Sequence, residues 1–219
     1  MNKAIWDRLS ALGGVLFVFF FIVGMLLPGS PPTVDDSAED VVAFFADNRG
    51  PILTGTLLVG LGVLAMLWFV SSLVEAMRRV DEGRLANVAQ MVFVLTFAVG
   101  TVSALAKAAL AYSVVGIIQP DEVRALFHLT LVLDTMGSLV FAAFALAIAG
   151  AAMRTTFLPR WWGFVSLVMG LIAILGATAW SRDGFWSPTG GIVWITNIAF
   201  VLYVVVMSIL HFREVSRAA

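Results

Sequence analysis

The stretch KAALAYSVVGIIQPDEVRALFHLTLVLD, residues 107–134, decides the fold. It begins at Lys107, ends at Asp134 and has a polar centre, QPDE at 119–122, that is typical of a turn. In an antiparallel helical hairpin with its turn centred between 120 and 121, residues 107 and 134 lie opposite each other at one depth. The sequence therefore predicts two helices joined by a tight turn and a Lys107–Asp134 ion pair between them.

The composition of the whole chain places this hairpin in a membrane. The 219 residues are 61% hydrophobic and 12% charged, with a mean hydropathy of +1.00, and a soluble domain of this size needs more charge on its surface. Cysteine is absent, which excludes disulfides, thiolate metal sites and cysteine nucleophiles. A net charge of −1 offers no basic surface for nucleic acid. We therefore expect an integral membrane protein in contact with membrane lipids.

Charge-free intervals predict six membrane spans, because roughly 20 apolar residues cross a hydrocarbon core of about 30 Å. The fold class is accordingly all-α, a six-helix transmembrane bundle that forms a single domain over residues 1–219. The third and fourth spans are longer than the core is thick, so they must tilt or project beyond it. The spans are expected at about 9–27, 52–74, 86–118, 123–153, 161–180 and 191–212.

The distribution of Lys and Arg among the short loops predicts the orientation. Cytoplasmic loops carry the excess of these residues. Nine fall on the side of the termini and three on the other side, so we expect both termini in the cytoplasm. The nine are Lys3, Arg8, Arg78, Arg79, Arg84, Arg154, Arg160, Arg213 and Arg217, and the three are Arg49, Arg124 and Arg182.

The outer loop between the first two spans contains a helix signal. SAED at 37–40 has capping-box spacing, and apolar residues follow before Gly50 and Pro51. This pattern predicts a short amphipathic helix that lies on the outer membrane surface or caps the bundle. A lid over an outer vestibule is the functional alternative.

Polar side chains on the third and fourth spans recur at helical spacing and form two facing stripes. The candidate substrate or ion path consists of Lys107, Asp134, Ser103, Thr130 and Asn197. Asn197 belongs to this path on condition that the sixth helix packs beside the central hairpin. Intramembrane charges often mark transport paths, and an isolated one costs about 2.5–3.5 kcal/mol at a helix centre. The alternative is structural, because a buried ion pair can fix the register of two helices without adding net stability.

His128 and Tyr112 lie one register step from facing each other in the same hairpin, nearer its turn. A hydrogen bond between them would create a pH-sensitive pair, because histidine titrates near neutrality. A single histidine near the membrane interface also serves as an anchor.

Patterns of known enzymes are absent from the sequence. Only two histidines occur, and no H-E-x-x-H, G-x-S-x-G or P-loop motif is present. The one nominal serine–histidine combination is Ser138 with His211, and it lacks the second glycine of an intramembrane protease motif. We therefore predict no catalytic residues, no metal site and no cofactor.

The opening RLSALGG at 8–14 resembles small six-span bacterial membrane proteins of unknown function, as do DVVAFFADNRG at 40–50 and LWF at 67–69. The resemblance is strongest over the first third of the chain. It implies the six-span topology and a bacterial inner membrane, and it implies no chemistry.

Two functions follow from these observations, and a lipid-modifying enzyme stays a third alternative, because an intramembrane lysine or aspartate can do acid–base work. The first is a small transporter or channel-like protein with an intramembrane Lys107–Asp134 site. The second is a non-catalytic accessory or structural subunit of a membrane complex, in which the pair is structural. Partners beyond lipids are a second copy of the chain or other membrane subunits.

Overall fold

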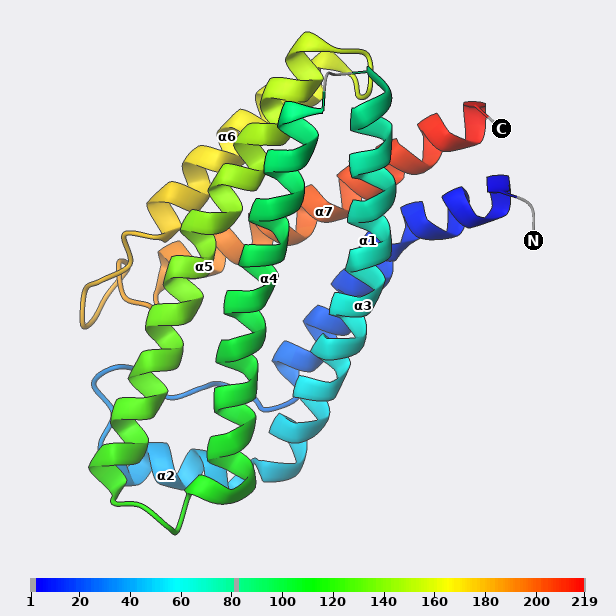
Figure 1. The fold of residues 1–219 in the computed structure, drawn as a ribbon. Coiled ribbons are helices and arrows are strands. Elements are labelled where there is room, and N and C mark those ends of the chain that lie inside the picture. The colour runs from blue at the N-terminus through cyan, green and yellow to red at the C-terminus, as the bar shows by residue number, and fades with distance from the viewer. Residues whose placement is uncertain (1–2, 81–82, 219) are drawn as a thin grey trace.

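The computed structural model describes residues 3–80 and 83–218, whose regular structure is helical throughout. Figure 1 shows α3 to α6 running side by side, α1 and α7 inclined across them, and α2 lying across one end, here called the α2 end. Both chain termini lie toward the opposite end, here called the terminal end. The elements are α1 (Lys3–Leu26), α2 (Ala38–Asp47), α3 (Arg49–Val80), α4 (Arg84–Ala109), the π-helical turn η1 (Leu110–Val114), α5 (Pro120–Arg154), α6 (Arg160–Gly176) and α7 (Gly191–Ala218).

The helical fold class is confirmed, but the predicted number of long spans is not. Within the described residues, five helices are long and apolar enough to cross a membrane. The helix expected at 161–180 ends early: α6 has 17 residues and stops at Gly176. Its length of about 25 Å is less than the hydrocarbon thickness of about 30 Å. The chain from 177 to 190 forms a loop instead.

The central hairpin forms as the sequence predicts, with a local distortion at its end. The α4 helix widens into the π-turn η1, and Gly116 adopts a φ of +91°, which favours glycine, before the chain enters α5. Pro120 occupies the first turn of α5, and the carboxylate of Glu122 accepts a hydrogen bond of 3.1 Å from the Gln119 N–H. These residues fix the start of α5 and the register of the hairpin.

The helices form a closed ring in the order α1, α3, α4, α5, α6, α7, and phenylalanines fill its centre. The ring of Phe17 lies 5.5 Å from Phe97 and 5.9 Å from Phe200, and Phe141 lies 4.8 Å from Phe200. These four residues, the aromatic layer, join α1, α4, α5 and α7 across the ring. A continuous apolar core extends from this layer toward the terminal end.

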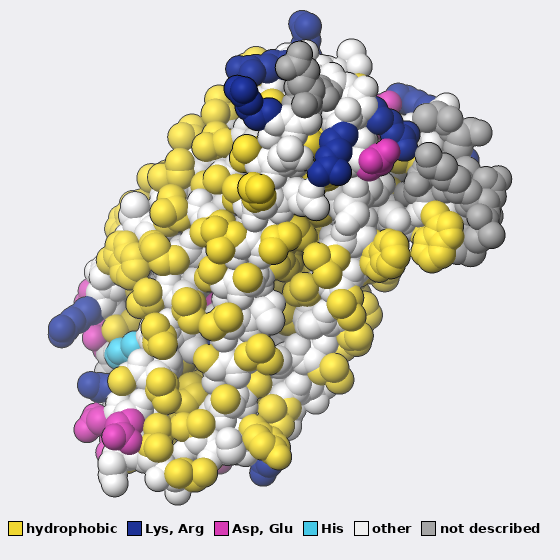
Figure 2. All heavy atoms as spheres, in the orientation of Figure 1, with side chains coloured by type: hydrophobic (Ala, Val, Ile, Leu, Met, Phe, Trp, Pro, Cys, Tyr) yellow, Lys and Arg dark blue, Asp and Glu magenta, His cyan; other side chains and the backbone are white. Residues whose placement is uncertain are grey.

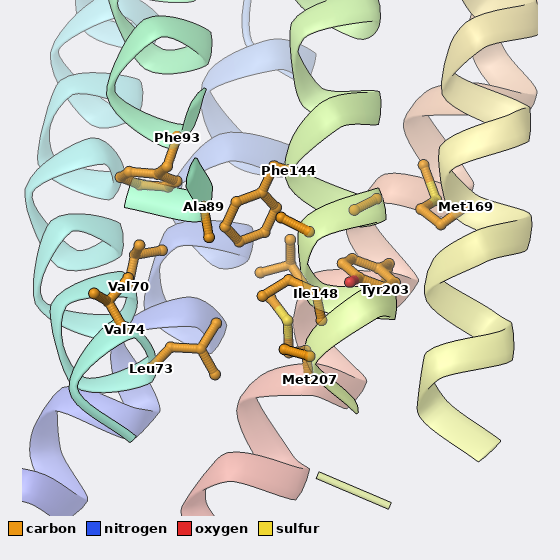
Figure 3. Packing of buried hydrophobic residues seen from close by; sticks show 14 of the residues in the cluster. Val70, Leu73, Val74, Ala89, Phe93, Phe144, Ile148, Met169, Tyr203 and Met207 are labelled. Carbon is orange, nitrogen blue, oxygen red and sulfur yellow. The ribbon is translucent and has the colours of Figure 1, made fainter. Parts of the chain in front are cut away.

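Figure 3 shows part of this core, where Phe93 of α4 and Phe144 of α5 face each other and Ile148, Tyr203 and Met207 continue the packing toward α7. Tyr203 is buried, and its hydroxyl oxygen lies 2.9 Å from that of Ser166 on α6. The terminal half of the bundle is therefore densely filled.

A second, separate hydrophobic cluster closes the α2 end. Ser37 caps α2 as predicted, accepting a hydrogen bond of 3.1 Å from the Asp40 N–H. The ring of Phe45 on α2 lies 5.8 Å from Phe127 on α5, so α2 caps the bundle. This α2 cluster comprises Val41, Phe45, Ile52, Leu110, Ala111, Val123, Phe127 and Leu131.

Small residues bring α1 and α3 into backbone contact. A β-carbon on Gly55 would lie 2.5 Å from the carbonyl oxygen of Gly24, and one on Gly62 would lie 3.2 Å from that of Phe17. Close approach of this kind replaces the hydrophobic effect as a packing force in lipid.

The surface has the charge distribution of a membrane protein. Figure 2 shows hydrophobic side chains over the middle of the molecule, Lys and Arg side chains at the terminal end, and acidic side chains gathered at the α2 end. Together with the five long apolar helices, this identifies an integral membrane protein.

Candidate functional site

The two charges predicted to face each other form an ion pair. The Nζ atom of Lys107 on α4 lies 2.6 Å from Oδ2 of Asp134 on α5. The pair lies in the gap between the two hydrophobic clusters. Leu110 and Leu131, on one side of it, belong to the α2 cluster, and Phe141, on the other side, belongs to the core of the terminal half.

Both charged residues are on the faces of their helices that point into the ring. Residues seven apart lie on nearly the same face of a helix. Lys107 therefore shares a face of α4 with Gly100 and Phe93, which precede it by seven and fourteen residues. Asp134 shares a face of α5 with Phe127 and Phe141, each seven residues away. Phe93, Phe127 and Phe141 are buried on these faces. Lys107 and Asp134 nevertheless remain 33% and 44% exposed. Part of each charged side chain is therefore accessible, and we call the level of the ring at which the pair lies, between the two hydrophobic clusters, the polar gap.

The α6 helix ends before it reaches the level of the ion pair. A β-carbon on Gly163 would touch the carbonyl oxygen of Ala149, and a β-carbon on Gly170 would touch the carbonyl oxygen of Ala142. These two contacts give the antiparallel register of α6 on α5. Continuing this register, the last residue of α6 lies beside position 136, so Asp134 lies beyond it. Figure 1 also shows α1 running toward α2 while α7 turns away behind α5.

The pair lies nearer to the turn of the central hairpin than to the terminal ends of its two helices. Arg154 marks the terminal end of α5, and about 30 Å of helix separates it from Asp134, as much as the hydrocarbon core is thick.

Ser103 and Thr130 are buried beside the pair and are satisfied within the hairpin. The hydroxyl of Ser103 donates to the carbonyl oxygen of Thr130 at 3.2 Å, and that of Thr130 donates to Phe127 O at 2.7 Å. They join α4 to α5 beside the ion pair.

Asn197 is half-buried on α7. The neighbours of α7 in the ring are α1 and α6, and its Phe200 ring reaches the central hairpin, 4.8 Å from the ring of Phe141 on α5. Asn197 lies one turn from Phe200, whose ring touches Phe141, on the α2 side of the aromatic layer. It therefore lies on the same side of the aromatic layer as the ion pair.

The structure does not bring His128 and Tyr112 together, and the described residues show no hydrogen bond between them. Tyr112 is 64% exposed, and the guanidinium carbon of Arg49 lies 5.5 Å from its ring centroid. The Nε2 atom of His128 is buried and has no hydrogen-bonding partner among the residues that the structure describes. The π-turn at 110–114 changes the local register, which the hairpin arithmetic assumed to be constant.

His128 lies instead in a cleft of about 320 Å³ at the α2 end, lined by Val34, Asp35, Arg124, His128 and Arg182. Sequence reasoning missed this cleft because its residues come from two loops and α5, and no spacing rule relates them. A second cleft of similar volume lies at the terminal end, between the α5–α6 loop and Glu214.

His211 has a hydrogen-bonding partner that the sequence did not suggest. Its Nε2 atom lies 2.8 Å from Oγ of Ser72 on α3, and the imidazole is buried against Phe69. Ser138 lies in the other half of the bundle, so the Ser138–His211 combination does not form. The Ser72 contact joins α3 to α7 near the terminal end.

Within residues 3–80 and 83–218, no three His, Cys, Asp or Glu side chains gather closely enough to hold a metal ion. A family model described as "Domain of unknown function (DUF4386)" matches residues 12–211. No curated protein matches the chain. No solved structure matches it either.

Proposed function

The chain belongs to the DUF4386 family, a domain of unknown function, and we propose that it is a small transporter or channel-like protein with its site in the polar gap. Lys107 and Asp134 bind the solute or ion there, and Asn197 contributes from α7. The observation that carries this proposal is that two ionised side chains face the interior of the ring and are still one-third or more exposed.

The two hydrophobic clusters supply the gates that such a site needs. The aromatic layer closes the ring toward the terminal end, and the α2 cluster covers the α2 end. Apolar constrictions on both sides of a polar site are a means of gating in channels and transporters. The α2 helix then acts as the lid of an outer vestibule.

The second candidate function is a non-catalytic accessory subunit. The short Lys107–Asp134 contact favours it, because a charge pair that satisfies itself needs no ligand. In that case a helix of a second copy, or of another membrane subunit, packs beside the end of α6.

The proposed topology has six crossings, including the short α6, with both termini in the cytoplasm. The Arg residues gathered at the terminal end support this orientation. The resemblance to bacterial membrane proteins supports an inner-membrane location. Because the chain has no cysteine, single cysteines at Ser37 and Arg217 can report it. An impermeant maleimide should label Ser37→Cys from outside intact cells and Arg217→Cys only after lysis, and the reverse pattern would refute the orientation.

Water access to the polar gap tests the proposed site directly. Gly100 faces the gap, is exposed, and has open space where a β-carbon would be. Gly60 on α3 is also exposed and open, but it lies on the outer, lipid-facing side of the ring. We expect an impermeant maleimide to label Gly100→Cys and not Gly60→Cys, because a thiol in lipid does not ionise. Equal protection of both cysteines from the maleimide would contradict the proposal that water reaches the polar gap.

A charge swap separates the two candidate functions. The double variant Lys107→Asp with Asp134→Lys keeps the pair and reverses its direction. Folded yield is measured in detergent, and proton flux is measured in proteoliposomes with an entrapped pH dye. Normal folding with lost flux supports the transport site, whereas flux equal to that of the unmodified protein supports a structural pair. If the unmodified protein shows no flux above empty liposomes, proton transport is excluded.

A further inference from the structure

Three segments that are distant in the sequence build the cleft at the α2 end. Asp35 comes from the loop between α1 and α2, Arg124 and His128 from the first turns of α5, and Arg182 from the loop between α6 and α7. Figure 2 shows basic, acidic and histidine side chains gathered in this part of the molecule. Its volume, about 320 Å³, is at the lower end of the range for small-molecule sites.

The positive charges of the cleft are not neutralised by the protein. Arg124 and Arg182 are two of three Lys or Arg residues expected on a face that is otherwise acidic, and both line this one cleft. Neither forms an ion pair within the described residues. Each guanidinium group presents a planar fork of donors that matches the oxygens of a phosphate, so a cleft lined by two arginines offers charge-assisted contacts to a phosphate group.

His128 adds a third polar group to this wall. Its buried Nε2 atom has no hydrogen-bonding partner within the described residues. Buried polar atoms in folded proteins are nearly always hydrogen-bonded, so this nitrogen is an unsatisfied group in the wall of the cleft.

Asp35 provides the opposite charge on the rim. It is exposed, lines the same cleft as the two arginines, and is in no ion pair within the described residues. A ligand that carries a phosphate and an ammonium group a few bonds apart would satisfy both sides of the cleft at once.

The surroundings of the cleft favour a lipid over a soluble molecule. Arg182 follows the exposed Trp180, and indole rings prefer the headgroup level of a membrane. Leu129 and Val132 are exposed on α5 beside His128, where they can contact acyl chains. We propose that the cleft binds the headgroup of an amine-bearing phospholipid, with the phosphate on Arg124 and Arg182 and the ammonium on Asp35.

Lipid retention measured by native mass spectrometry tests this site. The full-length protein is taken from nanodiscs that contain equal amounts of phosphatidylethanolamine and phosphatidylglycerol. We expect the unmodified protein to retain phosphatidylethanolamine preferentially. The Arg124→Gln/Arg182→Gln variant should lose about tenfold or more in retention of both lipids, because two charge-assisted contacts are removed. Asp35→Asn should keep binding and lose the preference between the two lipids.

Arg49→Gln is the matched control, because Arg49 is the third outer arginine and lies over Tyr112, outside the cleft. It should retain lipid like the unmodified protein, and thermal melting of each variant checks folding. Equal retention by Arg49→Gln and the double variant would overturn the site, as would a missing preference in the unmodified protein. Displacement of the lipid by free O-phosphoethanolamine at equal concentration would overturn the lipid as the source. The water-access experiment on Gly100 is independent of all these outcomes.

Discussion

A β-carbon on Gly55 would lie 2.5 Å from the carbonyl oxygen of Gly24, and one on Gly24 would lie 2.7 Å from that of Gly55. The two helices therefore touch through their backbones at this point. We expect Gly55→Ala to lower the free energy of unfolding by about 1–3 kcal/mol, since the added methyl group forces α1 and α3 apart. Reversible denaturation in mixed micelles measures the change.

Gly60 is the control for this substitution, because it lies on the same helix with open space at its β-carbon. Gly60→Ala should leave stability unchanged or raise it by up to about 1 kcal/mol, through the higher helix propensity of alanine. Equal effects at the two positions would show that the backbone contact does not hold the helices together.

The Lys107–Asp134 pair predicts a specific response to partial removal. Lys107→Gln leaves the Asp134 carboxylate without its ion-pair partner in the polar gap. We expect the free energy of unfolding to fall by about 1–3 kcal/mol, which lies between the contribution of a surface ion pair and the cost of a lone charge at a helix centre. Adding Asp134→Asn should recover part of the loss. A double variant that is less stable than Lys107→Gln would contradict the pairing.

The Ser72–His211 hydrogen bond should contribute to stability near the terminal end. Ser72→Ala removes the hydroxyl group that lies 2.8 Å from the buried Nε2 atom of His211. We expect this variant to lower the free energy of unfolding by about 1–3 kcal/mol. Ser71→Ala, at the exposed neighbouring position, serves as the control and should have little effect. Thermal melting monitored by Trp fluorescence compares the two variants.

Phe45 attaches α2 to the rest of the bundle. Phe45→Ala removes a buried ring that contacts Phe127, so we expect faster amide exchange across α2 and a loss of about 3–5 kcal/mol in the free energy that holds it in place. The same truncation at the exposed Phe19 is the control. Unchanged exchange in α2 would mean that the remaining α2 cluster is sufficient to hold it.

The sequence was sufficient to predict the central hairpin because one register rule relates all of its residues. Lys107 and Asp134 pair as that rule requires, and Ser37 caps α2 because the capping box is local. The rule fails for Tyr112 and His128, where the π-turn inserts a local change of register. Hydropathy indicated the position of α6 but not its end, because the apolar residues 177–180 continue past Gly176 as a loop.

Contacts between distant segments were beyond sequence reasoning. Ser72 and His211 are 139 residues apart, and the cleft around Arg124 joins two loops whose paths no periodicity determines. The exposure of the ion pair could not be predicted either. It depends on where α6 stops and on how α7 inclines, and both are properties of the packed ring.

The unequal lengths of α5 and α6 have a consequence for the lipid around the protein. On the side of α6 the molecule presents an apolar wall of 17 residues, about 25 Å high, whereas the 32-residue α3 presents a taller one. A bilayer meets such a body by thinning beside the short helix or by letting the whole bundle tilt. Either adjustment lowers the headgroups next to α6, so that polar lipid groups and water reach toward Asp134 from the side of the molecule.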